Sequence, residues 1–226
     1  MNKPKFAPSL LCMDMLHVGA QIQVMNKRAD YLHADLMDLR FVKNMGLGVT
    51  FVRSVCAIAN KPVDCHIMAE ELGWWLPALK DAGADMLTPH IEATGNKTAE
   101  IIRSIREMGC RVGLAISPKT PAEVLSPYLP LIDKVTVMTI EPGFPGAPFL
   151  WPMLDKIRFL AQLRAQMKLD FEIEMDGSCC DDNYEQLREA GTDVFVVGVA
   201  ALFGRDENLD RAFDLMEANF IGEDRC

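Results

Sequence analysis

Histidine and aspartate recur at the ends of predicted strands in this sequence. One such strand ends in His33-Ala34-Asp35, the next contains His66, and a later one ends in Asp176. Residues i and i+2 share one face of a strand, so His33 and Asp35 are expected to point the same way. Imidazole and carboxylate groups together suit Zn²⁺, Mn²⁺, Fe²⁺ or Co²⁺. The pattern therefore predicts a site for one divalent metal ion.

Glycines gather in three loops that follow the last three predicted strands. They lie in Gly143-Phe144-Pro145-Gly146, in Gly177-Ser178 and in Gly198-Val199-Ala200. Backbone N–H groups of such loops commonly bind a phosphate, helped by a helix N-terminus. Any one of these glycines is weak evidence, because turns need glycine anyway. Three clusters at the same end of one sheet predict a phosphate site.

The elements that must position these residues alternate along the chain. Short apolar or β-branched runs predict strands at residues 6–10, 31–36, 63–68, 86–90, 112–116, 135–139, 171–175 and 194–197. Apolar residues at helical spacing lie between them, as in residues 99–108, 153–167 and 183–190. This alternation predicts a single (β/α)8 TIM barrel domain over residues 1–226, with its chemistry at the carboxyl ends of the strands. A doubly wound sheet is the alternative, but no G-x-G-x-x-G follows the first strand.

A barrel interior is expected to be filled by apolar side chains, so a carboxylate there needs a partner, a metal or a catalytic role. Glu172 and Glu174 precede Asp176 on the same strand face, and we expect both to pair with basic groups inside the barrel. His90-x-Glu92 fits two interpretations equally, an outer pair that orients a metal ligand or a structural ion pair.

Three of the fourteen methionines, Met37, Met68 and Met138, lie at strand ends around the predicted metal site. They are expected to form an apolar collar that keeps water from a reactive intermediate.

The composition narrows the class of protein. The 226 residues contain 32 acidic and 23 basic side chains, a net charge of −9, which argues against nucleic acid and anionic membranes as partners. The longest apolar stretch, residues 194–203, is too short to span a membrane. Asp14 interrupts the first apolar run, so no signal peptide is expected. The seven cysteines include no C-x-x-C pair, which favours reduced cysteines in a cytoplasmic protein.

From end to end the sequence resembles the ribulose-phosphate 3-epimerase family. The matching runs are Ala7-Pro8-Ser9-Leu10, His33-x-Asp35-x-Met37-Asp38, Asp64-x-His66-x-Met68, His90-x-Glu92, Val137-Met138-Thr139 with Pro142-Gly143-Phe144, Asp176-Gly177 and Val197-Gly198. Three further runs look most like the D-allulose-6-phosphate 3-epimerases of that family: Asp64-Cys65-His66, Met138-Thr139-Ile140, and Glu172-Ile173-Glu174 leading to Asp176-Gly177-Ser178-Cys179.

The resemblance implies a role for each candidate residue. His33, Asp35, His66 and Asp176 would hold the metal, and Asp35 and Asp176 would also be the acid/base pair. The substrate would contact Ser9, His66, Met37, Met68 and Met138. The phosphate would be bound by Gly143, Phe144, Gly146, Gly177, Ser178, Gly198, Val199 and Ala200.

The implied reaction is inversion of C3 of a ketose phosphate, first D-allulose 6-phosphate to D-fructose 6-phosphate, and second D-ribulose 5-phosphate to D-xylulose 5-phosphate. A divalent ion stabilises the enediolate that forms when the poorly acidic C–H next to the carbonyl is deprotonated. One carboxylate takes that proton and the other returns one to the opposite face. The family also implies a homo-oligomer.

The sequence departs from the family pattern in three loops, and in one of them Val199-Ala200 lacks the hydroxyl group often found there. The usual D-G-x-F-V-P-N reads Asp38-Leu39-Arg40-Phe41-Val42-Lys43-Asn44, so leucine replaces a glycine. Pro145 lacks an N–H group for phosphate, and Ala147 stands in place of glutamine.

Two other functions stay open. One is a lyase of the same fold, although no lysine lies at a predicted strand end to form a Schiff base. The other is a sugar-phosphate binder without catalysis, which the altered loop suggests and the retained metal ligands oppose.

Overall fold

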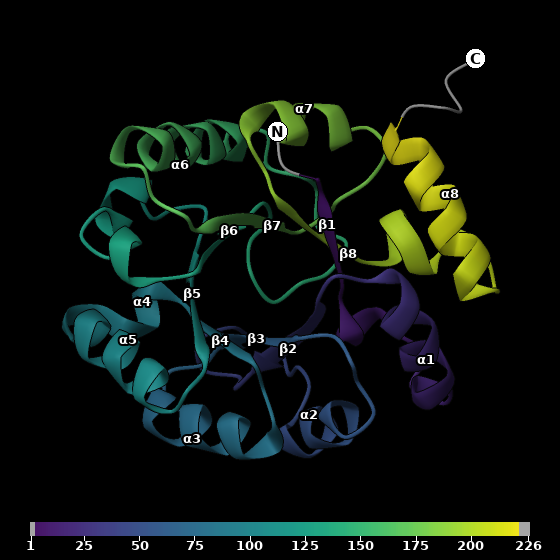
Figure 1. Cartoon of the computed structure of the whole chain (residues 1–226), viewed down its shortest axis with the longest axis horizontal. Helices are drawn as coiled ribbons and strands as arrows, with labels where there is room; N and C mark the ends of the chain where they lie inside the picture. The colour runs from purple at the N-terminus through teal and green to yellow at the C-terminus, as the bar shows by residue number, and fades with distance from the viewer. Residues whose placement is uncertain (1–2, 222–226) are drawn as a thin grey trace.

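Eight parallel strands form a barrel that is ringed by helices (Figure 1) in the computed structural model, which describes residues 3–221. The strands are β1 (Lys5–Pro8), β2 (Leu32–Met37), β3 (Val63–Met68), β4 (Met86–Pro89), β5 (Arg111–Ile116), β6 (Lys134–Met138), β7 (Glu172–Asp176) and β8 (Val194–Val197). Their order is β1-β8-β7-β6-β5-β4-β3-β2, and a bridge between Ser9 and His33 joins β1 to β2. The predicted (β/α)8 barrel is confirmed, with every strand within two residues of its predicted range. The ends of the expected 1–226 domain, residues 1–2 and 222–226, lie outside the described residues.

The helices lie on the outside of the barrel (Figure 1). They are α1 (Val18–Arg28), α2 (Val49–Cys56), α3 (Leu72–Ala82), α4 (Ile91–Thr94), α5 (Thr98–Glu107), α6 (Met153–Met167), α7 (Tyr184–Ala190) and α8 (Leu209–Ile221). The connection from β5 to β6 has 3-10 turns, η3 (Ala122–Leu125) and η4 (Leu129–Leu131), in place of an α-helix. Prolines at 118, 121, 127 and 130 explain this, because each removes a backbone donor.

The main apolar core lies between the outer face of the strands and the helices. It contains the fully buried Leu36 of β2, Val52 of α2, Ile157 of α6 and Phe213 of α8. The strand residues that face this core are apolar even where the residues between them are polar, as in Leu32–Met37, whose Leu32, Ala34 and Leu36 belong to the core. This is why their positions could be predicted.

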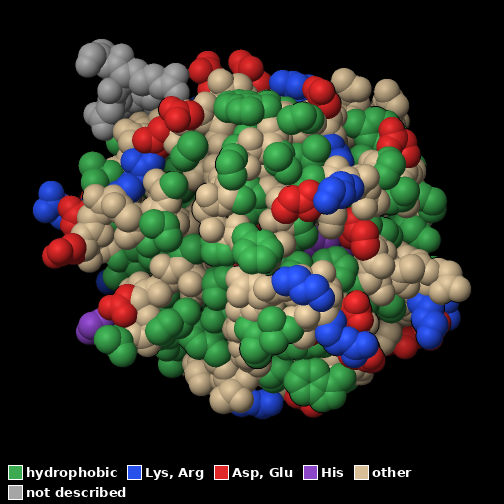
Figure 2. All heavy atoms as spheres, turned by 180° about the vertical axis from the view of Figure 1, so that it is seen from behind, with side chains coloured by type: hydrophobic (Ala, Val, Ile, Leu, Met, Phe, Trp, Pro, Cys, Tyr) green, Lys and Arg blue, Asp and Glu red, His purple; other side chains and the backbone are tan. Residues whose placement is uncertain are grey.

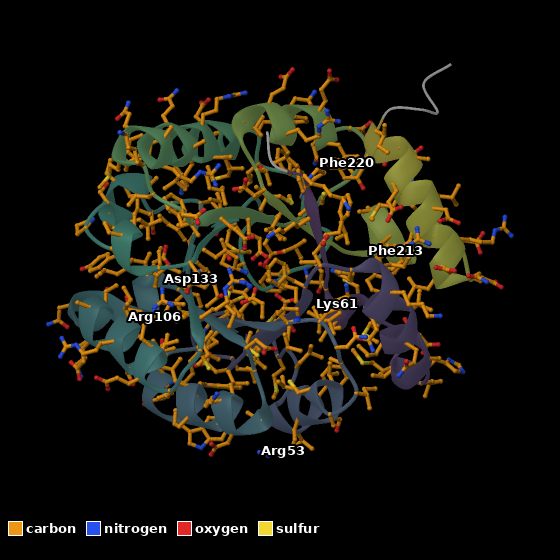
Figure 3. The ribbon with its side chains drawn as sticks, viewed as in Figure 1. Arg53, Lys61, Arg106, Asp133, Phe213 and Phe220 are labelled. Atoms are coloured by element: carbon orange, nitrogen blue, oxygen red, sulfur yellow. The ribbon has the colours of Figure 1, made fainter. Side chains whose placement is uncertain are left out.

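The last helix, α8, packs across the paired strands β1 and β8, which are the first and last of the barrel. Figure 3 labels Phe220 on α8. Its ring makes edge-on contacts with Phe6 of β1 and Phe195 of β8, at centroid distances of 5.0 and 4.9 Å. Edge-on aromatic pairs of this kind contribute about 0.5–1.5 kcal/mol each beyond burial. The two ends of the sheet are therefore held together by side chains as well as by strand pairing.

The barrel interior is polar, and the expectation of an apolar filling is wrong for most of it. At the amino ends of the strands, the Tyr31 hydroxyl donates to Glu172 Oε2 at 2.8 Å. Arg111 donates to the same hydroxyl at 2.9 Å, and Lys5 pairs with Glu172. The small apolar cluster inside contains Ala7, Tyr31, Val194 and Val196.

A second ionic layer lies above the first. The Lys134 ammonium bridges Asp64 and Glu174, at 2.6 Å from Glu174 Oε1, and all three side chains are almost inaccessible to solvent. Thr88 donates to Asp64 at 2.6 Å and Thr136 to Glu174 at 2.8 Å. The prediction that Glu172 and Glu174 pair with basic groups inside the barrel is confirmed.

Outside the barrel the surface is of mixed charge. Seen from behind, acidic and basic side chains are interspersed among apolar ones (Figure 2). Between residues 3 and 221, no helix has both the length and the apolar character needed to cross a membrane. The described cysteines form no disulfide, and Cys226 lies outside the described residues.

Candidate active site

A cavity of about 470 Å³ opens at the carboxyl ends of the strands. All eight predicted phosphate residues line it: Gly143, Phe144, Gly146, Gly177, Ser178, Gly198, Val199 and Ala200. Ser9, Asp35, Asp176 and the three predicted methionines, Met37, Met68 and Met138, line it too. No lysine among the described residues does so, which leaves a Schiff-base mechanism without a nucleophile.

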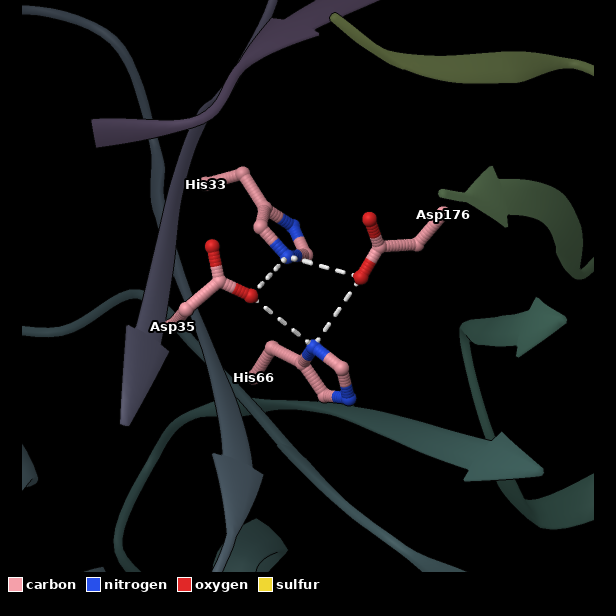
Figure 4. A group of neighbouring side chains, drawn as sticks. All are labelled: His33, Asp35, His66 and Asp176. Atoms are coloured by element: carbon pink, nitrogen blue, oxygen red, sulfur yellow. Dashed lines mark hydrogen bonds and ion pairs between the residues drawn. The ribbon is translucent and has the colours of Figure 1, made fainter. Parts of the chain in front are cut away.

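His33, Asp35, His66 and Asp176 lie together beside this cavity (Figure 4). The two aspartates line it, whereas His33 and His66 are fully buried and do not line it, although His66 was also expected to contact the substrate. His33 Nε2 lies 3.3 Å from Asp35 Oδ1 and 3.5 Å from Asp176 Oδ2. His66 Nδ1 lies 3.3 and 3.2 Å from the same two oxygens. The two carboxylates thus face each other across two fully buried imidazoles.

The strand register explains this arrangement. β2 and β3 pair so that Asp35 stands beside His66, and Asp176 ends β7 on the other side of the barrel. Ser9, just after β1, donates its hydroxyl to Asp35 Oδ2 at 2.8 Å. That bond leaves Oδ1 of Asp35 directed at the histidines.

The four donor atoms fit a divalent metal ion. Metal–ligand distances of about 2.0–2.1 Å place tetrahedral ligands about 3.3–3.4 Å apart. Four of the six separations between the donor atoms run from 3.2 to 3.5 Å, and all six lie within 4.8 Å. In addition, both ring nitrogens of His33 are buried, and their contacts of 3.3–3.7 Å with carboxylates do not have hydrogen-bond geometry. A buried ring nitrogen that lies between two carboxylates without such a bond suits a lone pair that binds a metal.

The electrostatics of the cluster favour a cation at its centre. Burial raises the pKa of Asp35, but His33 and His66 outweigh it and hold the pKa far below the ordinary value. Burial lowers the pKa of His66, but Asp176 and Asp35 outweigh it and raise the pKa to about 9. A proton or a metal ion between the carboxylates is therefore stabilised.

The outer nitrogens of both histidines also contact polar groups. His66 Nε2 lies 2.9 Å from His90 Nε2, and His90 Nδ1 lies 3.1 Å from Glu92 Oε2. Burial and the charge of His66 lower the pKa of His90 to about 4, against the effect of Glu92. His33 Nδ1 lies 3.3 Å from Asp64 Oδ2. Of the two interpretations of His90-x-Glu92, the contact with His66 favours the pair that orients a metal ligand.

Two of the glycines in the cavity wall are required by their surroundings. Gly143 has φ +96°, and a Cβ atom there would lie 2.8 Å from Val42 Cβ. Gly177 has φ +123°, and a Cβ atom there would lie 2.5 Å from Ile140 Cγ1. Ser178 also has positive φ, at +51°, and its hydroxyl donates to the Ala147 carbonyl rather than into the cavity.

In the altered loop after β2, Leu39 adopts the left-handed backbone conformation that normally favours glycine. Leu39 has φ +63° and a half-exposed side chain. Arg40 pairs with Glu70 and Glu71, both at 3.2 Å, and does not line the cavity. Lys43 is exposed and does not line it either, whereas Pro145 does.

Some lining residues escaped sequence reasoning: Leu11, Cys12, Ile140, Cys179 and Val196. None of them carries a charge, and only Ile140 and Cys179 lie in runs quoted above for the family resemblance. The signal that could have found most of them is their position directly after a predicted strand, where a barrel forms its mouth.

Comparison with known proteins identifies the fold and the family. The 3-keto-L-gulonate-6-phosphate decarboxylase of Vibrio cholerae has the same fold, with a TM-score of 0.71 over 97% of this chain and 98% of that chain, at 16% identity. The ribulose-phosphate 3-epimerase of Mycobacterium bovis is 38% identical over 204 residues, 90% of this chain and 88% of the relative. That of Bacillus subtilis is 35% identical over 205 residues, 90% and 94% of the two chains.

The model of one protein family matches residues 5–203, which include every strand of the barrel and the whole four-residue cluster. By this match and by the identity to curated relatives, the chain belongs to the ribulose-phosphate 3 epimerase family and is an isomerase.

Proposed function

We propose that this protein inverts C3 of a ketose phosphate, with D-ribulose 5-phosphate and D-xylulose 5-phosphate as the pair that the names of its relatives favour. One observation carries the proposal: Asp35 and Asp176 face each other across two buried histidines beside the cavity. Inversion at a carbon next to a carbonyl needs a base on each face, and opposed carboxylates meet that need.

In this mechanism the two aspartates exchange roles with the direction of the reaction. One carboxylate removes the C3 proton from its face, and the other, protonated, delivers a proton to the opposite face. The Ser9 hydroxyl on Asp35 Oδ2 orients that carboxylate during both steps. A divalent ion bound by His33, Asp35, His66 and Asp176 would supply Lewis-acid stabilisation of the enediolate charge.

The cavity wall would hold the rest of the substrate. Met37, Met68 and Met138 are almost fully buried and present an apolar surface beside the carboxylates. The glycine loops after β6, β7 and β8 would bind the phosphate mainly through backbone N–H groups, because Val199 and Ala200 carry no hydroxyl. We expect free D-ribulose to be a much poorer substrate, because the binding energy of the remote phosphate is used to lower the activation barrier at C3. Equal kcat/KM for the two compounds would contradict this.

D-allulose 6-phosphate, converted to D-fructose 6-phosphate, is the second candidate substrate. The runs that look most like D-allulose-6-phosphate 3-epimerases include Ile140, Ser178 and Cys179, and these three residues line the cavity. The residues at these positions can therefore touch the substrate. Steady-state kinetics on both ketose phosphates in parallel, compared by kcat/KM, decides between them.

The metal is tested separately from turnover. Protein purified with Mn²⁺ or Zn²⁺ should carry about one ion per chain, and His33→Ala and His66→Ala should each lower that occupancy steeply. His17→Ala, an exposed histidine outside the cluster, is the matched control. Full occupancy in both cluster variants would refute the proposed ligands.

The reaction itself is tested in D₂O. Wild-type protein should install deuterium at C3 as it inverts that centre, and Asp176→Asn or Asp35→Asn should lose inversion by ~10²–10⁴-fold even when loaded with metal. Metal content is measured beside exchange, because both residues belong to the cluster. Metal-loaded wild type without exchange on any ketose phosphate would indicate a binder in place of an enzyme. A metal-loaded Asp176→Asn protein with the wild-type rate would remove Asp176 from the mechanism.

A further inference from the structure

His66 has one ring nitrogen inside the four-residue cluster and one outside it. Nδ1 faces Asp35 and Asp176, while Nε2 points away from the cluster (Figure 4). The outer nitrogen lies 2.9 Å from His90 Nε2, and both rings are fully buried. The two rings are also stacked, with an interplanar angle of 26°. His66 is therefore held from outside by a second histidine.

The hydrogen-bond partners of His90 fix where the protons lie in this pair. A carboxylate accepts hydrogen bonds and cannot donate, so the His90 nitrogen next to Glu92 Oε2, Nδ1, carries a proton. In a neutral ring the other nitrogen, Nε2, is then an acceptor. A contact of 2.9 Å between two nitrogens needs one proton, which must come from His66 Nε2. A neutral His66 in this tautomer has its lone pair on Nδ1, directed at the cluster.

Glu92 is itself held by the loop after β5. The Ser117 N–H donates to Glu92 Oε1 at 2.9 Å, and the Ser117 hydroxyl lies 3.3 Å from His90 Nδ1. Lys156 on α6 donates to the carbonyls of Ser117 and Thr120 at 2.8 and 2.7 Å. The hydrogen-bonded path thus runs from helix α6 through the β5 loop to His66.

We propose that His90 and Glu92 are positioning residues that fix His66 in the tautomer whose Nδ1 can bind a divalent metal ion. This inference rests on the proposed metal-dependent function. Outer partners of metal-binding histidines typically contribute ~10–100-fold to metal affinity. We expect metal affinity to fall by that factor when His90 is replaced by a residue that cannot accept a hydrogen bond from His66.

Mn²⁺ affinity of the full chain, titrated in wild type and variants, tests the inference. His90→Phe keeps a ring of similar size but removes the acceptor, and should weaken Mn²⁺ binding ~10–100-fold. His90→Gln offers an amide oxygen to His66 and an N–H to Glu92, and should restore most of the affinity. Glu92→Ala, at a partly exposed position, should weaken binding in the same direction. His17→Phe is the matched control and should bind as wild type does.

A second measurement separates tautomer control from general damage. With diamagnetic Zn²⁺ bound, ¹⁵N spectra of wild type should show His66 protonated at Nε2 only, and His90→Phe should lose that pattern while far-UV circular dichroism stays unchanged. Wild-type affinity and an unchanged His66 spectrum in His90→Phe would overturn the inference and leave the proposed function standing. Wild-type protein that binds neither Mn²⁺ nor Zn²⁺ would overturn both.

Discussion

Removing the charge of Lys134 is expected to be the most destabilising change in the barrel interior that leaves the apolar core intact. Its ammonium is the cation between Asp64 and Glu174, and the three side chains are almost completely buried. Lys134→Met keeps the length of the aliphatic chain and deletes the charge. Two carboxylates then remain inside the barrel without their cation.

The magnitude follows from the cost of an uncompensated buried charge. Breaking a buried ion pair by removing one partner costs about 3–5 kcal/mol, a large part of the ~5–15 kcal/mol by which a domain is stable. At about 2–4 °C per kcal/mol for a chain of this size, the melting temperature should fall by roughly 6–20 °C. Burial already raises the pKa of Glu174, so that carboxyl takes up a proton readily. The loss should therefore be smaller at pH 5 than at pH 8.

Urea denaturation followed by circular dichroism measures this loss. Lys119→Met is the matched control, because Lys119 pairs with Glu141 at 2.9 Å in a largely exposed position and should cost less than ~1 kcal/mol. Adding Glu174→Gln to Lys134→Met should recover part of the loss, with a coupling of about 0.5–3 kcal/mol. If Lys134→Met costs no more than Lys119→Met, the ionic layer does not contribute as argued.

Three further changes are predicted from backbone geometry and charge. Leu39→Gly should stabilise the fold by about 0.5–1 kcal/mol, because removing the strain of a left-handed leucine outweighs the conformational entropy that glycine loses on folding. Leu16→Gly, at an exposed leucine without positive φ, is the control and should give no gain in the same urea titration. Gly177→Ala should cost at least ~1–3 kcal/mol, because its Cβ would overlap Ile140, whereas Gly48→Ala has open space and should cost less. Hydrogen bonds from Lys5 and Tyr31 lower the pKa of Glu172 below 4.5 despite burial, so the unfolded state binds its proton first as the pH falls. The stability that Glu172 contributes is thus present above pH 4.5 and lost below it. Between pH 6 and pH 3 the melting temperature should fall less for Glu172→Gln than for wild type, and equal falls would contradict this.

The sequence was sufficient for the barrel and for the candidate cluster because both depend on local patterns. The outward faces of the strands recur along the chain as apolar residues, and a two-residue period puts His33 and Asp35 on one face. The rule that chemistry lies at the carboxyl ends of barrel strands then joins them to His66 and Asp176.

The ionic interior and the support of His66 could not be predicted in the same way. Lys134 opens an apolar strand and meets Asp64, 70 positions earlier in the chain. Nothing near Lys134 distinguishes it from an exposed lysine. The contact between His66 and His90 depends on the register of β3 against β4, which pairs His66 with Thr88. The register of two strands is set by how their side chains pack, which the residue types of one sequence do not reveal.

The distribution of the four clustered residues along the chain has a consequence for synthesis. His33, Asp35 and His66 belong to the first two strands after β1, and Asp176 follows His66 by 176 − 66 = 110 residues. At about 5–20 residues per second, a ribosome needs roughly 5–20 s to cover that interval. During this time the nascent chain offers three donors on an open sheet, and β8 has not yet reached β1. Completion of the four-donor cluster therefore requires that every strand up to β7 has been synthesised.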